Sequence, residues 1–273
     1  MQREIIIRPT EPWWKIDFKE LWDYRELFFT LAWRDVVIRY KQTLLGVTWV
    51  VFQPIVTTGI FTILFGKIAK IPSDGLPYPL FTLIGLAFWN FFAAGVTAAS
   101  NSLIANSAII TKVYFPRTIV PIASIVTSVL DFFVTLVLVI LALIYFGYFP
   151  SWQTIYVLPI ILVLLIVLMS GLGMMLASLN VRFHDVRFIL PFFIQIGIYL
   201  SPIVYPLSVI YDYRRIFLIL NPLTAVVETA RALVLNAPIS WNLILIGYGV
   251  AFLVFFAGLW SFRQTESLFV DVS

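Results

Sequence analysis

Long apolar runs, separated by short polar stretches, follow one another along almost the whole chain. An α-helix needs about 20 consecutive apolar residues to cross a membrane core about 30 Å thick. Runs near this length predict six membrane-spanning helices, at residues 43–66, 80–99, 119–146, 155–179, 189–205 and 242–262. The pattern predicts an all-α polytopic membrane protein with three parts: an N-terminal segment 1–42, a transmembrane domain 43–262 and a tail 263–273.

A further apolar region, 207–240, has a different pattern. Prolines and charged residues divide it into two apolar pieces, 215–220 and 223–235, each too short to span. Two short helices that enter and leave on the same side fit this pattern, because irregular backbone at membrane depth must be surrounded by protein or water. We therefore predict a re-entrant helix pair before the last span. Glu228 and Arg231 can pair on one face of its second helix.

Lysine and arginine are distributed unevenly between the two sides that six spans define. The segment 1–42 holds eight of them, and the loops 100–118 and 180–188 together with the tail bring that side to thirteen. The other side carries five, which are Lys67, Lys70, Arg214, Arg215 and Arg231. Since basic residues favour the cytoplasmic side, both termini are predicted to be cytoplasmic. If 207–240 crossed the membrane instead, the tail would lie outside.

The composition agrees with a membrane protein and excludes several kinds of site. Of the 273 residues, 61% are hydrophobic and 12% are charged, whereas soluble domains carry roughly 25% charged residues. The chain has no cysteine, which excludes disulfides and thiolate metal sites. His184 is the single histidine, so one chain cannot form a multi-histidine metal site. We predict no metal site.

The N-terminal segment carries an amphipathic helical pattern directly before the first span. Apolar residues recur at helical spacing over residues 18–36, and the opposite face is charged. This pattern is typical of an interfacial helix that lies along the inner leaflet. Residues 33–54 pass without a turn signal into the first span, with Arg34, Arg39 and Lys41 just ahead of it. The helix is either a passive anchor or, given its acidic residues, a surface for a protein partner.

The loop 100–118 contains signals for a short helix. Asn106 and Ser107 can cap a helix over 108–114, and Pro116 ends it. On the cytoplasmic side such a helix has two interpretations that the residues alone do not separate. It either turns the chain between two spans or forms a docking ridge for a cytoplasmic protein.

The loop 180–188 concentrates polar residues, among them Arg182, His184 and Asp185. A tight, self-paired polar turn between two spans explains them better than catalysis does. His184 and Asp185 are adjacent, and adjacent residues on one element rarely face each other. They do not form a catalytic dyad by themselves.

Asp131 lies near the middle of the third predicted span. An unpaired charge there costs about 2.5–3.5 kcal/mol on insertion scales, so the side chain should face the bundle interior. We expect Thr127, Ser128 or Thr135 near it. A buried, hydrogen-bonded acid is the favoured interpretation, and a pore-lining or proton-linked group is the alternative.

Aromatic residues make up 17% of the chain, and several cluster within predicted spans. Aromatic rings present flat apolar faces on which sugars, lipids or other helices can pack. The candidates for a stacking surface are Phe88, Trp89, Phe92, Tyr199 and Tyr205.

The chain contains no motif that would bind ATP. A phosphate loop reads G-x-x-x-x-G-K-[ST], and the nearest string, from Gly59 to Ile68, has the wrong spacing and no hydroxyl residue after Lys67. It also lies in an apolar run. The protein is therefore either passive or supplied with energy by a separate subunit, and we do not expect it to be an enzyme.

Four blocks of the sequence then carry a family resemblance. They read WRDVVIRYKQTLLGVTWVVFQP, ANSAIITKVYFPRTIVPIAS, LNVRFHDVRFILPFFIQIGIYLSPIVYP and LNPLTAVVETAR. In this order they resemble the characteristic blocks of ABC-2 permeases. The most similar branch is the polysaccharide-export group, which includes O-antigen, capsule and teichoic-acid transporters.

The resemblance implies an assembly and assigns roles to loops. It implies a homodimer of six-span subunits with two cytoplasmic ATPase subunits, which would bind ATP and Mg, so that this chain needs no cofactor. The amphipathic helix would be an interface or gate helix. The loop 106–116 would be the coupling helix. Its candidate contact residues are Asn106, Lys112, Tyr114, Pro116 and Arg117.

The resemblance also implies periplasmic gate helices over 207–240. The candidate gate residues are Asn221, Pro222, Glu228 and Arg231. The resemblance does not assign a partner to the inner turn that contains Arg182, His184 and Asp185.

The implied substrate is a long polysaccharide such as O-antigen, carried on undecaprenyl diphosphate and exported across the bacterial inner membrane. Arg34, Arg39 and Lys41 could meet the diphosphate, and the five aromatic candidates could line a glycan channel. Membrane lipids are the other expected contacts, and nucleic acid is not expected. One alternative is an ABC-2 exporter of another substrate, such as teichoic acid, capsule, a drug or a small lipid. A membrane enzyme that acts on polyprenyl-linked sugars is less favoured, because the chain has no D-x-D or D-D-x-x-D string.

Overall fold

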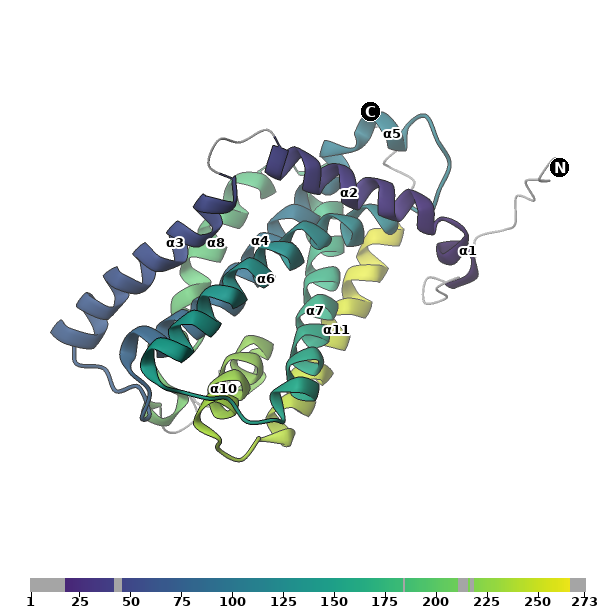
Figure 1. The fold of residues 1–273 in the computed structure, drawn as a ribbon. Coiled ribbons are helices and arrows are strands. Elements are labelled where there is room, and N and C mark those ends of the chain that lie inside the picture. Colours follow the sequence, from purple (N-terminus) through teal and green to yellow (C-terminus); the bar gives the residue numbers. More distant parts are fainter. Residues whose placement is uncertain (1–17, 42–45, 184, 211–215, 217–218, 266–273) are drawn as a thin grey trace.

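The structure, a computed structural model, describes residues 18–41, 46–183, 185–210, 216 and 219–265. Every regular element within these residues is a helix (Figure 1). In chain order they are α1 (Phe18–Asp23), α2 (Arg25–Lys41), α3 (Gly46–Phe61), the π-helix η1 (Thr62–Ile68), α4 (Tyr78–Ala105), α5 (Ser107–Ile110), α6 (Ile119–Phe146), α7 (Thr154–Arg182), α8 (Val186–Leu200), the 3-10 helix η2 (Leu207–Val209), α10 (Pro222–Leu235) and α11 (Trp241–Thr265).

Five helical segments are long and apolar enough to cross a membrane. They are Thr48–Ile68, Tyr78–Ala105, Ile119–Phe146, Thr154–Arg182 and Trp241–Thr265. These segments correspond to five of the six predicted spans, and they confirm an all-helical, multi-pass membrane protein. The count of six spans and the cytoplasmic position of both termini stay predictions.

The remaining predicted span, 189–205, is a shorter helix than the apolar run suggests. Helix α8 covers Val186–Leu200, 15 residues, which amounts to about 22 Å of helix. It stops because Pro202 follows, and the residue before a proline is disfavoured in the α-helical region. Ser201 accordingly adopts an extended backbone, with φ −110° and ψ 150°. The prediction that this helix continues to residue 205 was therefore wrong.

Helix α4 is the centre of the bundle. Within its most apolar window 72% of the residues are buried, against 11% for the segment Thr48–Ile68 at the edge. It packs on α6 and α7, and α7 packs on α11 (Figure 1). The α7–α11 contact requires glycine, because a Cβ atom on Gly258 would lie 2.0 Å from the carbonyl oxygen of Gly171.

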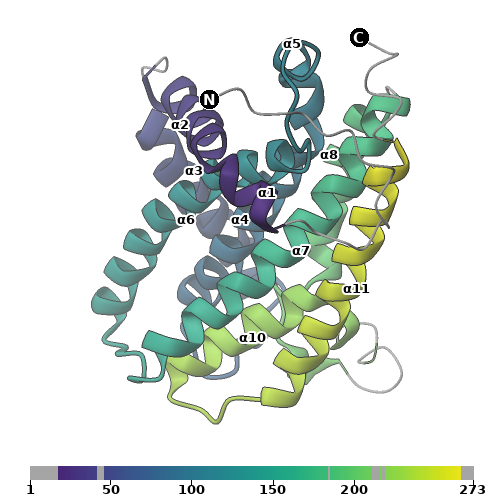
Figure 2. The ribbon, with the colours of Figure 1, turned by 90° about the vertical axis from the view of Figure 1, so that its right-hand side faces the viewer.

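The two ends of the bundle are built from different elements. At one end, called here the α5 end, Leu31, Ile110, Phe115 and Phe262 share one buried cluster. This cluster brings α2, the 106–118 loop and the end of α11 together. At the opposite end, called here the α10 end, α10 lies among α4, α7 and α11 (Figure 2).

Helix α10 matches the second predicted re-entrant piece, 223–235. The Asn221 side chain caps it by accepting a hydrogen bond from the amide of Leu223 at 3.1 Å, and Pro222 occupies the first turn. Proline is favoured there because its missing N–H would have no helical partner. Most residues of α10 are buried. Of the first predicted piece, 215–220, the structure describes residues 216, 219 and 220. Arg214 and Arg215 lie outside the described residues, so the re-entrant path stays a prediction.

Candidate functional site

Helix α2 contacts the bundle through one face and presents aromatic rings on another. Leu31, Ala32 and Val36 are buried, while Phe29 and Trp33 are about two-thirds exposed, at 66% and 67%. The helix therefore has apolar residues on two faces rather than the single apolar face that its sequence predicted. The predicted continuity of α2 with the first span depends on residues 42–45, which lie outside the described residues.

Arg34 joins α2 to the beginning of the 106–118 loop. Its guanidinium donates to Asn106 Oδ1 at 2.6 Å and also pairs with the neighbouring Asp35 at 2.6 Å. Asn106 is buried and donates from Nδ2 to the carbonyl oxygen of Ser102 at 2.8 Å. The predicted cap residue Asn106 thus connects α4, the loop and α2.

The end of α2 supplies Asp131 with one ion-pair partner and one hydrogen-bond donor. Arg39 Nη2 lies 2.5 Å from Asp131 Oδ2, and the hydroxyl of Tyr40 donates to Oδ1. The prediction of a buried, hydrogen-bonded acid is confirmed, since Asp131 is 8% exposed. Of the hydroxyl residues expected near Asp131, Thr135 donates to the Asp131 carbonyl oxygen and Ser128 to that of Ile125. Neither of them donates to the carboxylate, and the buried Thr127 hydroxyl has no hydrogen-bond partner among the described residues.

Tyr40 keeps its proton in this setting. Burial raises the pKa of its hydroxyl above the usual value near 10, and the hydrogen bond to Asp131 and the charge of Asp131 raise it further. The hydroxyl therefore stays a neutral donor to Asp131 at physiological pH. Lys41, at the end of α2, is exposed.

The 106–118 loop presents an exposed ridge over a buried base. Helix α5 covers only Ser107–Ile110, one turn, so the predicted helix over 106–116 is shorter than expected. Residues 111–114 follow it and are exposed, with the Tyr114 side chain at 78%. Phe115 is buried in the cluster below them and holds the ridge against the bundle. Lys112 belongs to this ridge, and Pro116 and Arg117 are partly buried beside it.

The five aromatic candidates do not gather in one place within the chain. Phe88 and Trp89 are buried, Phe88 beside Phe132 with ring centres 5.2 Å apart. Trp89 packs on α8, because a Cβ atom on Gly197 would lie 2.6 Å from its ring. Phe92 is partly buried with its ring centre 5.7 Å from that of Trp89. Phe88 and Trp89 thus serve core packing in the single chain.

Tyr199 and Tyr205 lie where α8 ends. Tyr199 is half exposed, and the hydroxyl of Tyr205 donates to the carbonyl oxygen of Tyr199 at 2.9 Å. This bond closes the short turn between them. It leaves the Tyr199 ring available at the surface of the chain.

Arg231 joins three segments at the α10 end. It pairs with Glu228 at 3.1 Å, which confirms the predicted pair. Its guanidinium lies 3.4 Å from the centre of the Phe81 ring. Its hydrogen bonds to carbonyl oxygens reach Pro202 at 2.7 Å, Ile203 at 2.9 Å and Phe81 at 3.2 Å. Asn221 adds a bond to Ser201 Oγ at 2.9 Å, so the segment after α8 is held to α10 at two points.

The α7–α8 turn shows no pairing among its described residues. Arg182 and Arg187 lie over the rings of Phe183 and Phe188, with their guanidinium carbons 5.4 Å and 5.0 Å from the ring centres. Asp185 is exposed, and no ion pair joins it to either arginine in the described part of the turn. The predicted self-pairing is therefore absent there. His184 lies outside the described residues.

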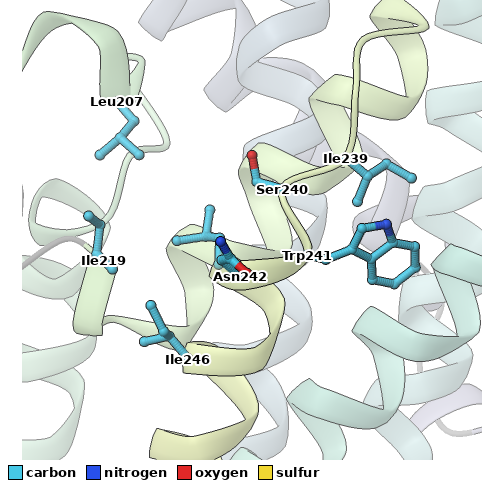
Figure 3. Close-up of a pocket in the computed structure, with 8 residues that line it drawn as sticks. Leu207, Ile219, Ile239, Ser240, Trp241, Asn242 and Ile246 are labelled. Atoms are coloured by element: carbon cyan, nitrogen blue, oxygen red, sulfur yellow. The ribbon is translucent and has the colours of Figure 1, made fainter.

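An open pocket of about 520 Å³ lies at the α10 end (Figure 3). Leu207 and Ile219 lie on one side, and Trp241, Asn242 and Ile246 at the start of α11 lie on the other. Aliphatic side chains dominate it, and none of the five aromatic candidates is among its lining residues. Within the described ranges no group of three or more acidic or histidine side chains could hold a metal ion.

These features define a multi-pass helical membrane protein, with an exposed ridge at the α5 end and a buried arginine at the α10 end. The family model for the ABC-2 type transporter matches residues 26–235, and this chain belongs to that family. The match covers α2, the 106–118 loop, α6 and α10.

Individual relatives extend over nearly the whole chain. It is 27% identical over 247 residues to the O-antigen export system permease protein RfbA of Klebsiella pneumoniae, a match that covers 90% of this chain and 95% of the relative. A protein of the same name from Myxococcus xanthus is 27% identical over 79% of this chain and 82% of its own length. The polysialic acid transport protein KpsM of Escherichia coli is 26% identical over 85% of this chain and 91% of its own length.

Proposed function

We propose that this chain is the membrane-spanning subunit of an ATP-driven exporter of lipid-linked polysaccharide, of the O-antigen type, in the bacterial inner membrane. The observation that carries the proposal is the similarity, over most of both chains, to permeases named for O-antigen export. The proposed substrate is a polysaccharide on an undecaprenyl diphosphate carrier. Its export would require energy from a partner, because the sequence holds no phosphate loop.

The proposed energy source is a pair of cytoplasmic ATPase subunits that dock at the α5 end. The exposed ridge 111–114 supports this role, since it combines the protruding Tyr114 with the basic Lys112 on a buried base. Aromatic side chains of this kind are enriched among residues that dominate protein interfaces. ATP and Mg would then bind to the partner subunits. The proposed contact residues on this chain are Asn106, Lys112, Tyr114, Pro116 and Arg117.

The proposed channel forms between two copies of the chain. The segment Thr48–Ile68 is the least covered of the five candidate spans, and α8 exposes Phe188, Phe192 and Phe193. Lipid and a second copy are the two occupants that suit such apolar faces inside a membrane. The exposed Tyr199 would then be available to contact a glycan. Phe88 and Trp89, which are buried, would support the channel wall through core packing.

The proposed entry site for the lipid diphosphate is the basic end of α2. Lys41 is exposed there, and the Arg39 side chain is 45% exposed while paired with Asp131. Arginine and lysine both bind phosphate oxygens through charge-assisted hydrogen bonds. Arg34 contributes from the side of the 106–118 loop. At the α10 end, Asn221, Pro222, Glu228 and Arg231 would form the outer gate.

A second candidate is the export of a capsule-type polysaccharide. The similarity to KpsM, named for polysialic acid transport, favours it. The two candidates differ in which glycan remains inside the cell when the chain is removed. Deleting the gene should retain O-antigen on its lipid carrier under the first proposal, and capsule under the second.

The experiment deletes the gene in its own bacterium and identifies the lipid-linked glycan that accumulates on the cytoplasmic side. Restoring the wild-type chain should return that glycan to the cell surface. Normal surface glycans in the deletion strain would overturn the proposal.

Docking is tested with matched tyrosine variants of the complex. Tyr114→Ala should reduce co-purification of the ATPase by about tenfold or more, because truncating an interface anchor often costs about 2 kcal/mol. Tyr145→Ala is the control, since Tyr145 is equally exposed, at 81%, but lies at the far end of α6. Equal co-purification of both variants would remove Tyr114 from the proposed docking site.

A further inference from the structure

Helix α2 is fixed to the bundle at two polar points that lie on different elements. Arg34 reaches Asn106, where α4 passes into α5, at 2.6 Å. Arg39 and Tyr40 reach Asp131 in the middle of α6. The buried Val36 lies between these points on α2. The 106–118 loop runs directly into α6 at Ile119. Through α2 it has a second connection, to the middle of α6 at Asp131.

The two sides of the Asp131 contact differ in their access to water. Asp131 has a side chain 11% exposed, and that of Arg39 is 45% exposed. If α2 moved away, Arg39 could bind water or lipid phosphate instead. Asp131 would stay behind as a charge within a membrane helix, which is costly. The cost of leaving the Asp131 charge unpaired favours the position in which α2 is docked on α6. The contact can still open, because the Arg39 side chain is partly exposed to solvent.

We propose that Asp131 is a positioning residue, which holds α2 on α6 through Arg39 and Tyr40 so that displacement of the 106–118 loop is passed to the third span. This proposal rests on the proposed function, because it assumes that the loop is displaced by a partner. The three residues Arg39, Tyr40 and Asp131 are called the Asp131 anchor below. Its role is transmission of movement, and it does not itself contact ATP.

Two further features agree with this role. Tyr40 gives Asp131 a neutral donor that remains when Arg39 is engaged elsewhere, so the anchor can loosen in steps. The hydrophobic contacts of Leu31 and Ala32 lie near the Arg34 end of the helix. The Arg39 end therefore depends more on its polar contact.

The first test measures whether Asp131 keeps α2 docked, and it needs neither the ATPase nor a glycan. The chain has no natural cysteine, so a single Val36→Cys can be added to the full-length protein and reacted with a maleimide in membranes. Val36 is 9% exposed, so the wild-type background should react slowly. Adding Asp131→Asn should speed labelling about tenfold, equivalent to about 1.4 kcal/mol of lost docking free energy.

Three matched variants make this result specific. Ile38→Cys, at a position 50% exposed, should react at the same rate with or without Asp131→Asn, and Ala99→Cys, fully buried in α4, should stay protected in both. Thr127→Val removes another buried polar group one turn earlier on α6 and should not change the labelling of Cys at 36. Unchanged labelling in Asp131→Asn, or equal acceleration by Thr127→Val, would overturn the anchor.

The second test measures transmission in the complete complex. Asp131→Asn should keep the amount of permease and of co-purified ATPase near wild type while export per hydrolysed ATP falls about tenfold. Asp131→Glu should restore part of the export, because the carboxylate is retained. Export that falls only in proportion to the amount of protein would make Asp131 purely structural and overturn the proposal. Wild-type protein that exports no glycan would instead contradict the proposed function and leave the labelling result to decide the anchor.

Discussion

Two arginine–carboxylate pairs lie in different parts of the bundle, one at the α10 end and one between α2 and α6, and are built in different ways. Arg231 and Glu228 are three residues apart on one helix, and the arginine side chain is only 4% exposed. Arg39 and Asp131 come from different helices, and the arginine side chain is 45% exposed. The Arg231 guanidinium also donates hydrogen bonds to three carbonyl oxygens and lies over the ring of Phe81.

This difference separates a fixed contact from a reversible one. Displacing Arg231 would break several bonds at once and leave carbonyl oxygens buried without a donor, which is costly. Displacing Arg39 separates it from Asp131 on a side chain that is already 45% exposed to solvent. We therefore expect the α10 end to act as a rigid support and the α2 contact to move during the transport cycle.

The largest expected effect comes from Arg231→Met. It leaves Glu228 unpaired and three carbonyl oxygens without their donor, and breaking a buried pair from one side costs about 3–5 kcal/mol. The thermal midpoint of the detergent-purified protein should fall sharply. Arg187→Met is the control, since Arg187 is exposed at the start of α8. Equal midpoints for the two variants would show that Arg231 does not stabilise the α10 end.

The next largest effect is expected from variants of the Arg39–Asp131 pair, and it should differ between the two residues. Arg39→Gln leaves the Asp131 charge inside the bundle with Tyr40 as its hydrogen-bond donor. It should lower the free energy of unfolding by about 2 kcal/mol, which is less than the roughly 2.5–3.5 kcal/mol for an unpaired charge at the membrane centre. Asp131→Asn removes that charge, and the freed arginine reaches water. The free energy of unfolding should therefore fall less for Asp131→Asn than for Arg39→Gln, although the docking of α2 on α6 is weakened. Thermal midpoints measure this order.

The double variant sharpens this comparison further. Combining Arg39→Gln with Asp131→Asn should return the midpoint close to that of Asp131→Asn alone, because no charge remains buried. Labelling of a cysteine at position 36 should nevertheless stay fast, since α2 has lost its polar contact. A double variant as unstable as Arg39→Gln would contradict the claim that the buried carboxylate causes the loss.

The same two pairs show what the sequence could and could not predict. Glu228 and Arg231 were predicted to pair because a spacing of three on one helix is a local geometric fact. Burial of Asp131 was also predictable from the cost of a charge in a membrane. Its carboxylate partners were not, because Tyr40 is 91 residues away in sequence. Thr135, which was expected nearby, bonds to the backbone of Asp131 rather than to its carboxylate.

Helix ends show a similar limit. The apolar run through residue 205 suggested a long helix, yet Pro202 stops α8 at Leu200. The 106–118 loop has a cap and a proline where a helix of two turns would need them, yet α5 is one turn long. Phe115 is buried below the loop, and this tertiary contact draws the chain away from the helical path. Hydropathy reports burial in general and does not specify which contact ends an element.

The smallest expected effect is that of Tyr40→Phe, which removes one neutral donor to Asp131 and keeps the ring. A hydrogen bond to a charged group contributes about 1.5–3 kcal/mol when its loss leaves the partner unsatisfied, but Arg39 still pairs with Asp131. The docking free energy of α2 on α6 should therefore fall by about 1 kcal/mol or less. This loss would be measured as modestly faster labelling of a cysteine at position 36. Adding Tyr40→Phe to Arg39→Gln should lower the docking free energy of α2 by more than the sum of the two single changes, since Asp131 then loses both its ion-pair partner and its hydrogen-bond donor on α2. Residues that share one partner are expected to be non-additive, so an additive result would show that Arg39 and Tyr40 act independently of each other and would contradict their shared contact with Asp131.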